Sequence, residues 1–172
     1  GEEGFFGTAA IDLKPSRVGG YDIRTASLHV AAEGPELILE IRKLDTPYGR
    51  SQGRAVVKGI LPLDRAKRID LSVSAQDVNP ALLFFRDDVE SAIGFSLQAG
   101  FVLPHNLDID AIGGYAHIRM LPSSVMDYDI FSGELEAEWS GDQVRVEKFS
   151  IFGDMGEIEA SGAGSWRHLL CQ

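Results

Sequence analysis

The chain has 172 residues, of which 44% are hydrophobic and 24% are charged, the composition of a folded domain rather than of a disordered segment. Its formal net charge of −10 argues against nucleic acid as a partner, because binding to phosphates requires basic residues. The same charge does not argue against an apolar ligand held in a groove. No stretch approaches the roughly 20 apolar residues of a membrane helix, so we expect no membrane span in this segment.

The ends of the chain give two further indications. The one cysteine, Cys171, lies next to the C-terminus, so no internal disulfide can form and the redox compartment stays open. The sequence starts at Gly1 rather than Met. We therefore expect residues 1–172 to be a single β domain excised from a longer protein.

Apolar and polar residues alternate through the first half of the chain, which predicts strands. The apolar positions are Ala26, Leu28, Val30 and Ala32, then Leu37, Leu39 and Ile41, then Ala55, Val57, Gly59 and Leu61, then Ile69, Leu71, Val73 and Ala75. Turn signals at Gly34-Pro35, Pro62 and Asn79-Pro80 separate these runs. After Ile41 the apolar register shifts to Leu44, which predicts a β-bulge or a strand end.

The clearest alternation in the chain covers residues 93–103, which predicts one long strand. Its apolar parity holds Ile93, Phe95, Leu97, Ala99, Phe101 and Leu103. At about 3.3 Å per residue the strand would be roughly 35 Å long. Further runs follow at Leu107, Ile109 and Ala111, with a bend expected at Gly113-Gly114, and then at Leu135, Ala137 and Trp139, at Val144 and Val146, and at Ile158 and Ala160.

Together these runs predict an all-β fold: an elongated, mostly antiparallel, repeat-like sheet of about ten strands with an apolar interior. Residues 80–86 form the only helix candidate, with Asn79 as a cap. The segment from Leu28 to Leu39 also resembles the segment from Leu135 to Val146. Such internal similarity favours stacked hairpins over a closed globule.

One motif could indicate a hydrolase, because residues 49–53 read G-x-S-x-G around Ser51. In hydrolases this motif forms a sharp turn between a strand and a helix, which exposes the serine. Here a strand pattern follows instead, so we interpret residues 49–53 as a polar hairpin turn. A hydrolase acting through Ser51 remains a third hypothesis, and Ser51→Ala would test it.

Metal sites are also not indicated. Asp127, Asp129 and Glu138 imitate the spacing of a calcium loop, but Phe131 stands where an oxygen ligand is required. The four histidines, His29, His105, His117 and His168, have no metal-ligand spacing. We therefore expect no catalytic residues, no metal and no cofactor.

The chain resembles the AsmA-like proteins, including the TamB group, from about residue 20 to residue 166. The resemblance rests on Leu28-x-Val30, Gly34, Leu37-x-Leu39-x-Ile41, Gly53, Val57-x-Gly59, Ile69-x-Leu71-x-Val73 and Asp77-Val78-Asn79-Pro80, and then on Ser132-Gly133-Glu134-Leu135, Trp139-x-Gly141, Val144-x-Val146, Phe149, Gly156 and Gly162. It implies a folded-over sheet called a β-taco. It also implies a full-length protein anchored in the inner membrane, spanning the periplasm and linked to phospholipid movement or outer-membrane protein assembly. The family has no catalytic residues to carry over.

The leading hypothesis is a non-enzymatic periplasmic segment of an envelope-spanning protein. It would have a hydrophobic groove for phospholipid transfer between the inner and outer membranes, or for outer-membrane biogenesis. The expected partners are phospholipid acyl chains and, for the full-length chain, an outer-membrane assembly protein. Residues expected to line the groove or form the core are Leu28, Val30, Leu37, Leu39, Leu71, Val73, Phe95, Leu97, Leu135 and Val146. The alternative is a closed β-sandwich, a structural or interaction module of a large surface or envelope protein.

Overall fold

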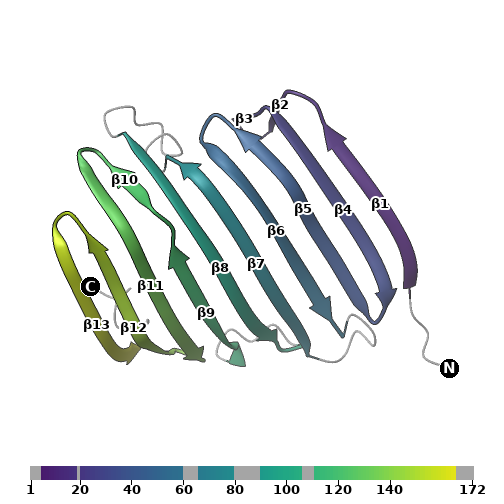
Figure 1. The fold of residues 1–172 in the computed structure, drawn as a ribbon. Helices are drawn as coiled ribbons and strands as arrows, with labels where there is room; N and C mark the ends of the chain where they lie inside the picture. The colour runs from purple at the N-terminus through teal and green to yellow at the C-terminus, as the bar shows by residue number, and fades with distance from the viewer. Residues whose placement is uncertain (1–4, 19, 60–65, 80–89, 106–110, 166–172) are drawn as a thin grey trace.

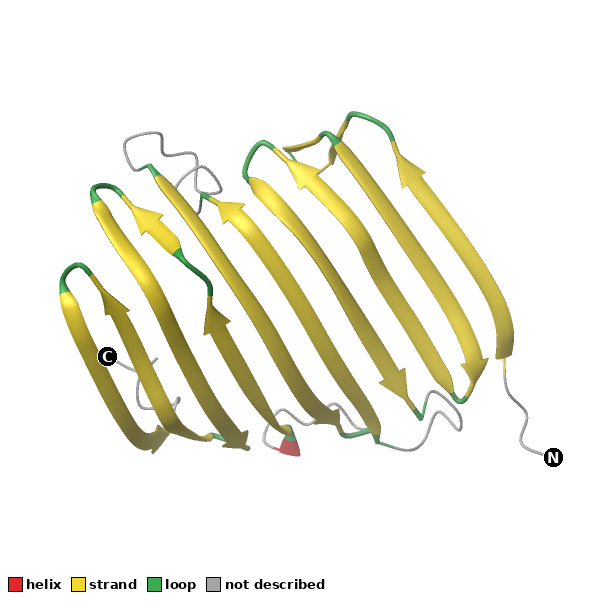
Figure 2. Cartoon of the chain, viewed as in Figure 1, coloured by secondary structure: helices red, strands yellow, loops and turns green. Residues whose placement is uncertain are grey.

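The computed structural model describes residues 5–18, 20–59, 66–79, 90–105 and 111–165, and these residues form an all-β fold (Figure 2). The strands are β1 (Phe5–Leu13), β2 (Ser16–Val18), β3 (Tyr21–Ile23), β4 (Thr25–Gly34), β5 (Glu36–Thr46), β6 (Gly49–Lys58), β7 (Lys67–Val78), β8 (Ser91–Leu103), β9 (Gly113–Met120), β10 (Ser123–Val125), β11 (Tyr128–Ser140), β12 (Gln143–Gly153) and β13 (Gly156–Ser165). The described residues contain no α-helix.

Eleven of the strands form one antiparallel sheet that follows the order of the chain from β1 to β13 (Figure 1). The remaining two, β2 and β3, pair only with each other as a small hairpin. The strands β9 and β10 share one position between β8 and β11, so the sheet has ten positions. The expectation of an elongated, antiparallel, all-β sheet is confirmed, and residues 93–103 lie in one strand, β8.

A proline accounts for the break between β9 and β10. Pro122 has no N–H group to donate to the sheet. The buried side chain of Ser123 connects this position to β8 at the break: its Oγ accepts a hydrogen bond from the Gly94 N–H at 2.9 Å and donates one to the Leu121 carbonyl at 2.6 Å. The pairing of this position with β8 therefore continues past the proline.

Bulges keep the apolar residues on one side of the sheet. A strand normally places residues i and i+2 on one face, but a bulge inserts one extra residue and changes that spacing to three. Register shifts of this kind separate Ile41 from Leu44, Ala75 from Val78, and Val146 from Phe149. The register shift predicted at Leu44 is therefore confirmed as a bulge.

Two hairpins show the internal similarity that the sequence suggested. The turn between β4 and β5 and the turn between β11 and β12 each have two residues, and each begins with a glycine of positive φ, Gly34 at 62° and Gly141 at 61°. A glycine at the first position is typical of tight turns whose twist matches the flanking strands. Leu28 and Leu135 precede these glycines by the same spacing and lie on the same face of the sheet.

Two local expectations are wrong. Residues 49–53 lie inside β6 rather than in a turn, since the turn comes earlier, at Pro47-Tyr48. Gly113 and Gly114 begin β9 instead of forming a bend. The helix expected at residues 80–86, the positions Leu107 and Ile109, and Cys171 lie outside the described residues.

The sheet is a single layer over the part of the chain that the structure describes (Figure 1). The buried apolar side chains there are small or medium in size: Ala26, Ala31, Ile38, Val56, Ala75 and Ala99. Every described aromatic side chain with an assigned burial is half-buried or exposed. A two-layer sandwich would bury its large side chains between the layers, and the described strands do not enclose such a core.

Candidate functional site: the apolar face

One face of the sheet is almost entirely apolar, and we call it the apolar face. Cross-strand register places its side chains in four rows, each with one residue from every position of the sheet. The rows are Ala9, Val30, Leu39, Ala55, Leu71, Ala99, Ala116, Ala137, Val146 and Gly162; Ile11, Leu28, Ile41, Gly53, Val73, Leu97, Ile118, Leu135, Phe149 and Ala160; Gly7, Ala32, Leu37, Val57, Ile69, Phe101, Gly114, Trp139, Val144 and Gly164; and Leu13, Ala26, Leu44, Ser51, Ala75, Phe95, Met120, Gly133, Ile151 and Ile158. Ser51 is the one polar residue among them.

The apolar face is large compared with ordinary exposed patches. Neighbouring strands lie about 4.8 Å apart and residues i and i+2 about 6.7 Å apart, so ten positions and four rows cover on the order of 1,000 Å². The largest apolar patch on a typical monomer is about 300–600 Å², and larger ones mark binding surfaces. The size of this face therefore makes it the strongest candidate for a functional site.

All ten residues expected to line a groove or form a core lie on this face. They are Leu28, Val30, Leu37, Leu39, Leu71, Val73, Phe95, Leu97, Leu135 and Val146. None of the ten is buried: nine are half-buried and Leu39 is exposed. In the described structure they thus form the surface of an open face rather than the centre of a packed core.

Small residues open a hollow near one edge of the apolar face. The edge strand β13 contributes Ala160, Gly162 and Gly164, which leave the larger side chains of β11 and β12 uncovered. The hollow has a volume of about 780 Å³ and is lined by Leu135, Val144, Val146 and Phe149 together with β13. A Cβ atom added at Gly162 would meet nothing within 4 Å.

A second hollow lies where the β2–β3 hairpin meets the apolar face. Its volume is about 400 Å³. The residues that line it are Tyr21, Ile23, Leu44, Thr46, Tyr48, Gly49, Arg50, Ser51, Val73, Ala75, Val78 and Phe95. The rings of Tyr21 and Tyr48 meet edge to face, with centroids 5.9 Å apart at 85°. We call this space the hairpin hollow.

Ser51 lies in the hairpin hollow, but its surroundings differ from those of a hydrolase serine. The G-x-S-x-G motif positions its serine on a sharp turn between a strand and a helix. Ser51 is the third residue of β6, and β6 continues without interruption to Lys58. The local geometry of the motif is therefore that of an ordinary strand.

The opposite face, the polar face, carries ion-pair networks. Glu40 is surrounded by His29 at 3.6 Å, Arg42 at 3.4 Å and Arg54 at 3.6 Å. Asp70 accepts a hydrogen bond from Arg68 at 2.9 Å, which lowers its pKa, and pairs with Lys58 at 3.2 Å. The charges of these carboxylates are satisfied within the sheet.

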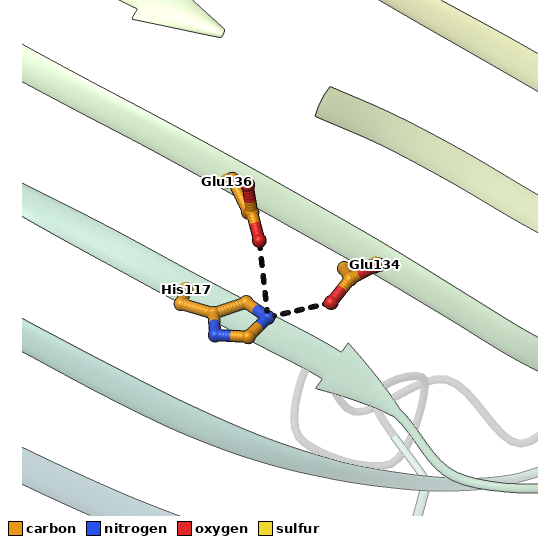
Figure 3. A group of neighbouring side chains, drawn as sticks. All are labelled: His117, Glu134 and Glu136. Carbon is orange, nitrogen blue, oxygen red and sulfur yellow. Dashed lines mark hydrogen bonds and ion pairs between the residues drawn. The ribbon is translucent and has the colours of Figure 1, made fainter. Parts of the chain in front are cut away.

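The polar face also brings together three side chains that could bind a metal ion, His117, Glu134 and Glu136 (Figure 3). His117 Nε2 lies 2.8 Å from Glu134 and 3.8 Å from Glu136. Glu134 is also bonded to Lys148 at 2.5 Å and lies 3.7 Å from Arg119. Hydrogen bonds from Lys148 and with His117 lower the pKa of Glu134 to about 2. Lys148 and Arg119 already pair with the Glu134 carboxylate, so we interpret the cluster as an ion-pair network.

Asp129 and Glu138, which have the spacing of calcium-loop ligands in the sequence, lie far apart in the structure. Asp129 and Glu138 both lie in β11, nine residues apart along an extended strand. At about 3.3 Å per residue their Cα atoms are about 30 Å apart. The two carboxylates therefore cannot share one calcium ion within the chain.

No family model, curated protein or solved structure matches the chain. No helix among the described residues is long and apolar enough to cross a membrane. The geometry defines a class of protein fold: a single-layer antiparallel sheet with one continuous apolar face and one polar face that carries ion pairs. The resemblance to the AsmA-like proteins stays a prediction.

Proposed function

We propose that the apolar face carries the acyl chains of phospholipids and shields them from water, without any chemical reaction. The observation that supports this most strongly is the set of four apolar rows, in which Ser51 is the one polar residue. Acyl chains have no hydrogen-bonding groups, so a binding surface for them needs apolar area and little else.

The energy of such binding is sufficient without specific contacts. Each methylene group removed from water contributes about 0.8 kcal/mol, so burying half a dozen contributes about 5 kcal/mol. The lipid headgroups stay in water beside the open side of the face, where they lose no hydration. A surface of this kind holds a chain and still lets it move along the rows.

The resemblance supports the wider setting of the proposal. In that setting the segment lies in the periplasm, in a longer protein anchored in the inner membrane. The protein passes phospholipid toward the outer membrane or serves outer-membrane biogenesis, and an outer-membrane assembly protein is its partner. The segment itself catalyses no reaction and provides part of the apolar surface along which the lipid moves.

Site-specific photocrosslinking in cells tests the proposal. Leu97 lies on the apolar face, and Gln98, its exposed neighbour in β8, lies on the polar face. Because successive side chains of a strand point to opposite faces, we expect p-benzoylphenylalanine at Leu97 to capture phospholipid roughly tenfold more than at Gln98. A probe at Phe95 should behave like the one at Leu97.

Two outcomes would contradict the proposal. Equal capture of phospholipid at Leu97 and Gln98 would show that lipid contact is unspecific. Capture of protein alone at Leu97 would show that the apolar face is an interface, as expected of a structural or interaction module. Ser51→Ala should leave the capture unchanged.

A further inference from the structure

Among the described residues, the β2–β3 hairpin covers the hairpin hollow on one side, and no other described element covers the apolar face. The strand β3 contacts β5, and the Arg24 N–H donates a hydrogen bond to the Asp45 carbonyl at 2.9 Å. Figure 1 shows the β2–β3 hairpin at the ends of β4 and β5. Tyr21 and Ile23 of this hairpin line the hollow together with Leu44 of the sheet. The hairpin therefore adds a second wall to a surface that the other described residues leave open.

The strand ends beside the hollow are held together by backbone contacts. The Asn79 N–H donates a hydrogen bond to the Tyr48 carbonyl at 2.9 Å, which joins the β5–β6 turn to the end of β7. A Cβ atom added at Gly49 would lie 2.8 Å from the Cα atom of Val78, so the backbones are in close contact there. In the other direction the apolar rows continue through Val73 and Leu97. The hollow thus lies at the end of the apolar rows, beside the wall that Tyr21 and Ile23 of the hairpin form.

The lining of the hollow favours an apolar group over a headgroup. Arg50 is the one charged residue in it, and its guanidinium pairs with Asp77. A phosphate or an ammonium group placed there would lose its hydration without meeting an unpaired charge, which is costly. The volume of about 400 Å³ accommodates about a dozen groups the size of a water molecule, at about 30 Å³ each, and a methylene group is of similar size.

We propose that the hairpin hollow receives the methyl end of an unbranched alkyl chain that lies on the apolar face. This inference rests on the proposed function and adds a direction to it: the methyl end points toward the β2–β3 hairpin and the headgroup points away along the strands. The hairpin acts as an end stop: it limits how far the alkyl chain can extend and so sets its position on the apolar face.

Fluorescence quenching tests the direction of the chain. The pocket probe is the variant Phe95→Trp with Trp139→Phe and Trp166→Phe, and the reference probe is the natural Trp139 with Trp166→Phe. The quenchers are stearic acids that carry a nitroxide at carbon 5 or at carbon 16. Since quenching requires close approach, we expect the pocket probe to be quenched about twofold more by the carbon-16 nitroxide than by the carbon-5 nitroxide.

The outcomes separate the two proposals. Suppose that Trp139 is quenched, but that the carbon-5 nitroxide quenches the pocket probe as strongly as the carbon-16 nitroxide does, or more strongly. This result would overturn the end stop and leave the proposed function standing. Absence of quenching at both probes would overturn both proposals.

A matched pair of variants adds a second readout. Ile23 lines the hollow, whereas Val18 on the same hairpin is 55% exposed and does not line it. Ile23→Glu should abolish the preference for the carbon-16 nitroxide, and Val18→Glu should preserve it. A preference that survives Ile23→Glu would overturn the inference, because the chain end would then lie elsewhere.

Discussion

Two neighbouring residues of β5 illustrate how differently the two faces of the sheet are built. Ile38 lies on the polar face and is only 8% exposed, whereas Leu39 lies on the apolar face and is 41% exposed. The more deeply buried side chain is thus on the face with the charges. The polarity of a face alone does not decide how well its apolar residues are protected from water.

The length of the neighbouring side chains explains this difference. On the polar face, Ala31, Ile38 and Val56 form a small buried cluster, and long side chains such as Glu40, Arg54 and Lys58 flank it on the same strands. Their aliphatic stems can cover apolar surface while their charges pair with one another. On the apolar face the cross-strand neighbours of Leu39, Val30 and Ala55, are themselves apolar, so its surface can be covered only by something outside the sheet.

Truncation on the two faces should therefore have unequal effects, and this is the largest effect that we predict. Ile38→Ala removes buried methyl groups and should lower the free energy of unfolding by about 2–4 kcal/mol, whereas Leu39→Ala should lower it by about 1 kcal/mol. Denaturant unfolding followed by circular dichroism measures both. If Leu39→Ala cost as much as Ile38→Ala, the apolar face would be packed in solution.

Glycines test how closely the apolar face is packed. A Cβ atom at Gly114 would lie 2.5 Å from the Gly100 carbonyl oxygen and 2.6 Å from the Trp139 ring, whereas one at Gly164 would meet nothing within 4 Å. Gly114→Ala should therefore destabilise the protein by about 1–3 kcal/mol, and Gly164→Ala should have little effect. Thermal unfolding of the two variants checks this, and equal midpoints would contradict the described packing of Trp139 on Gly114.

Filling the hollow beside β13 should separate binding from stability. Gly162→Leu adds a side chain to open space on the apolar face, so the free energy of unfolding should change by less than about 0.5 kcal/mol. Phospholipid capture by a photocrosslinker at Val146, the cross-strand partner of Gly162, should fall. Ala163→Leu places the same side chain on the opposite face and is the control. Equal capture in both variants would show that acyl chains do not occupy this hollow.

The smallest effect concerns the polar face. Because Lys148 and His117 lower the pKa of Glu134 to about 2, the ionised carboxylate favours the folded state at neutral pH. That contribution is lost as the pH falls from the ordinary value of about 4.5 toward about 2. Lys148→Met should raise the pKa of Glu134 toward its ordinary value, as an NMR titration of the side-chain carboxyl would show. Arg145→Met, which removes a partner of Glu147, should leave it unchanged.

The sequence predicts most of the sheet, because alternation identifies both a strand and its apolar face. It misses elements whose alternation is weak. In β1 the apolar parity is Gly7, Ala9, Ile11 and Leu13, and its small residues give little contrast with the other face. The strands β2 and β3 have three residues each, too few for a pattern.

The bulges have a signature in the sequence, an apolar spacing of three residues instead of two. An apolar spacing of three occurs at Ile41 and Leu44, at Ala75 and Val78, and at Val146 and Phe149. Our prediction of a bulge covers only the first of these three positions. A spacing of three within an alternating run is therefore a useful indicator of a bulge in sheets of this kind.

The openness of the face could not be predicted from the sequence. The alternation of apolar and polar residues shows which side chains share a face of the sheet. The same pattern fits a groove and a sandwich core, because only the structure shows what packs against that face. The cluster of His117 with Glu134 is also invisible in the sequence, because cross-strand pairing brings together residues 17 positions apart. The hairpin hollow depends on a local fold of β2 and β3 that no pattern indicated.

Mass spectrometry of lipids that remain with the purified protein tests the central claim most directly. We expect phospholipid to copurify with the unaltered protein and with Gln98→Glu, and to be lost from Leu97→Glu, because only the latter places a charge on the apolar face. The absence of phospholipid from the unaltered protein, or its equal retention by the two variants, would contradict the account.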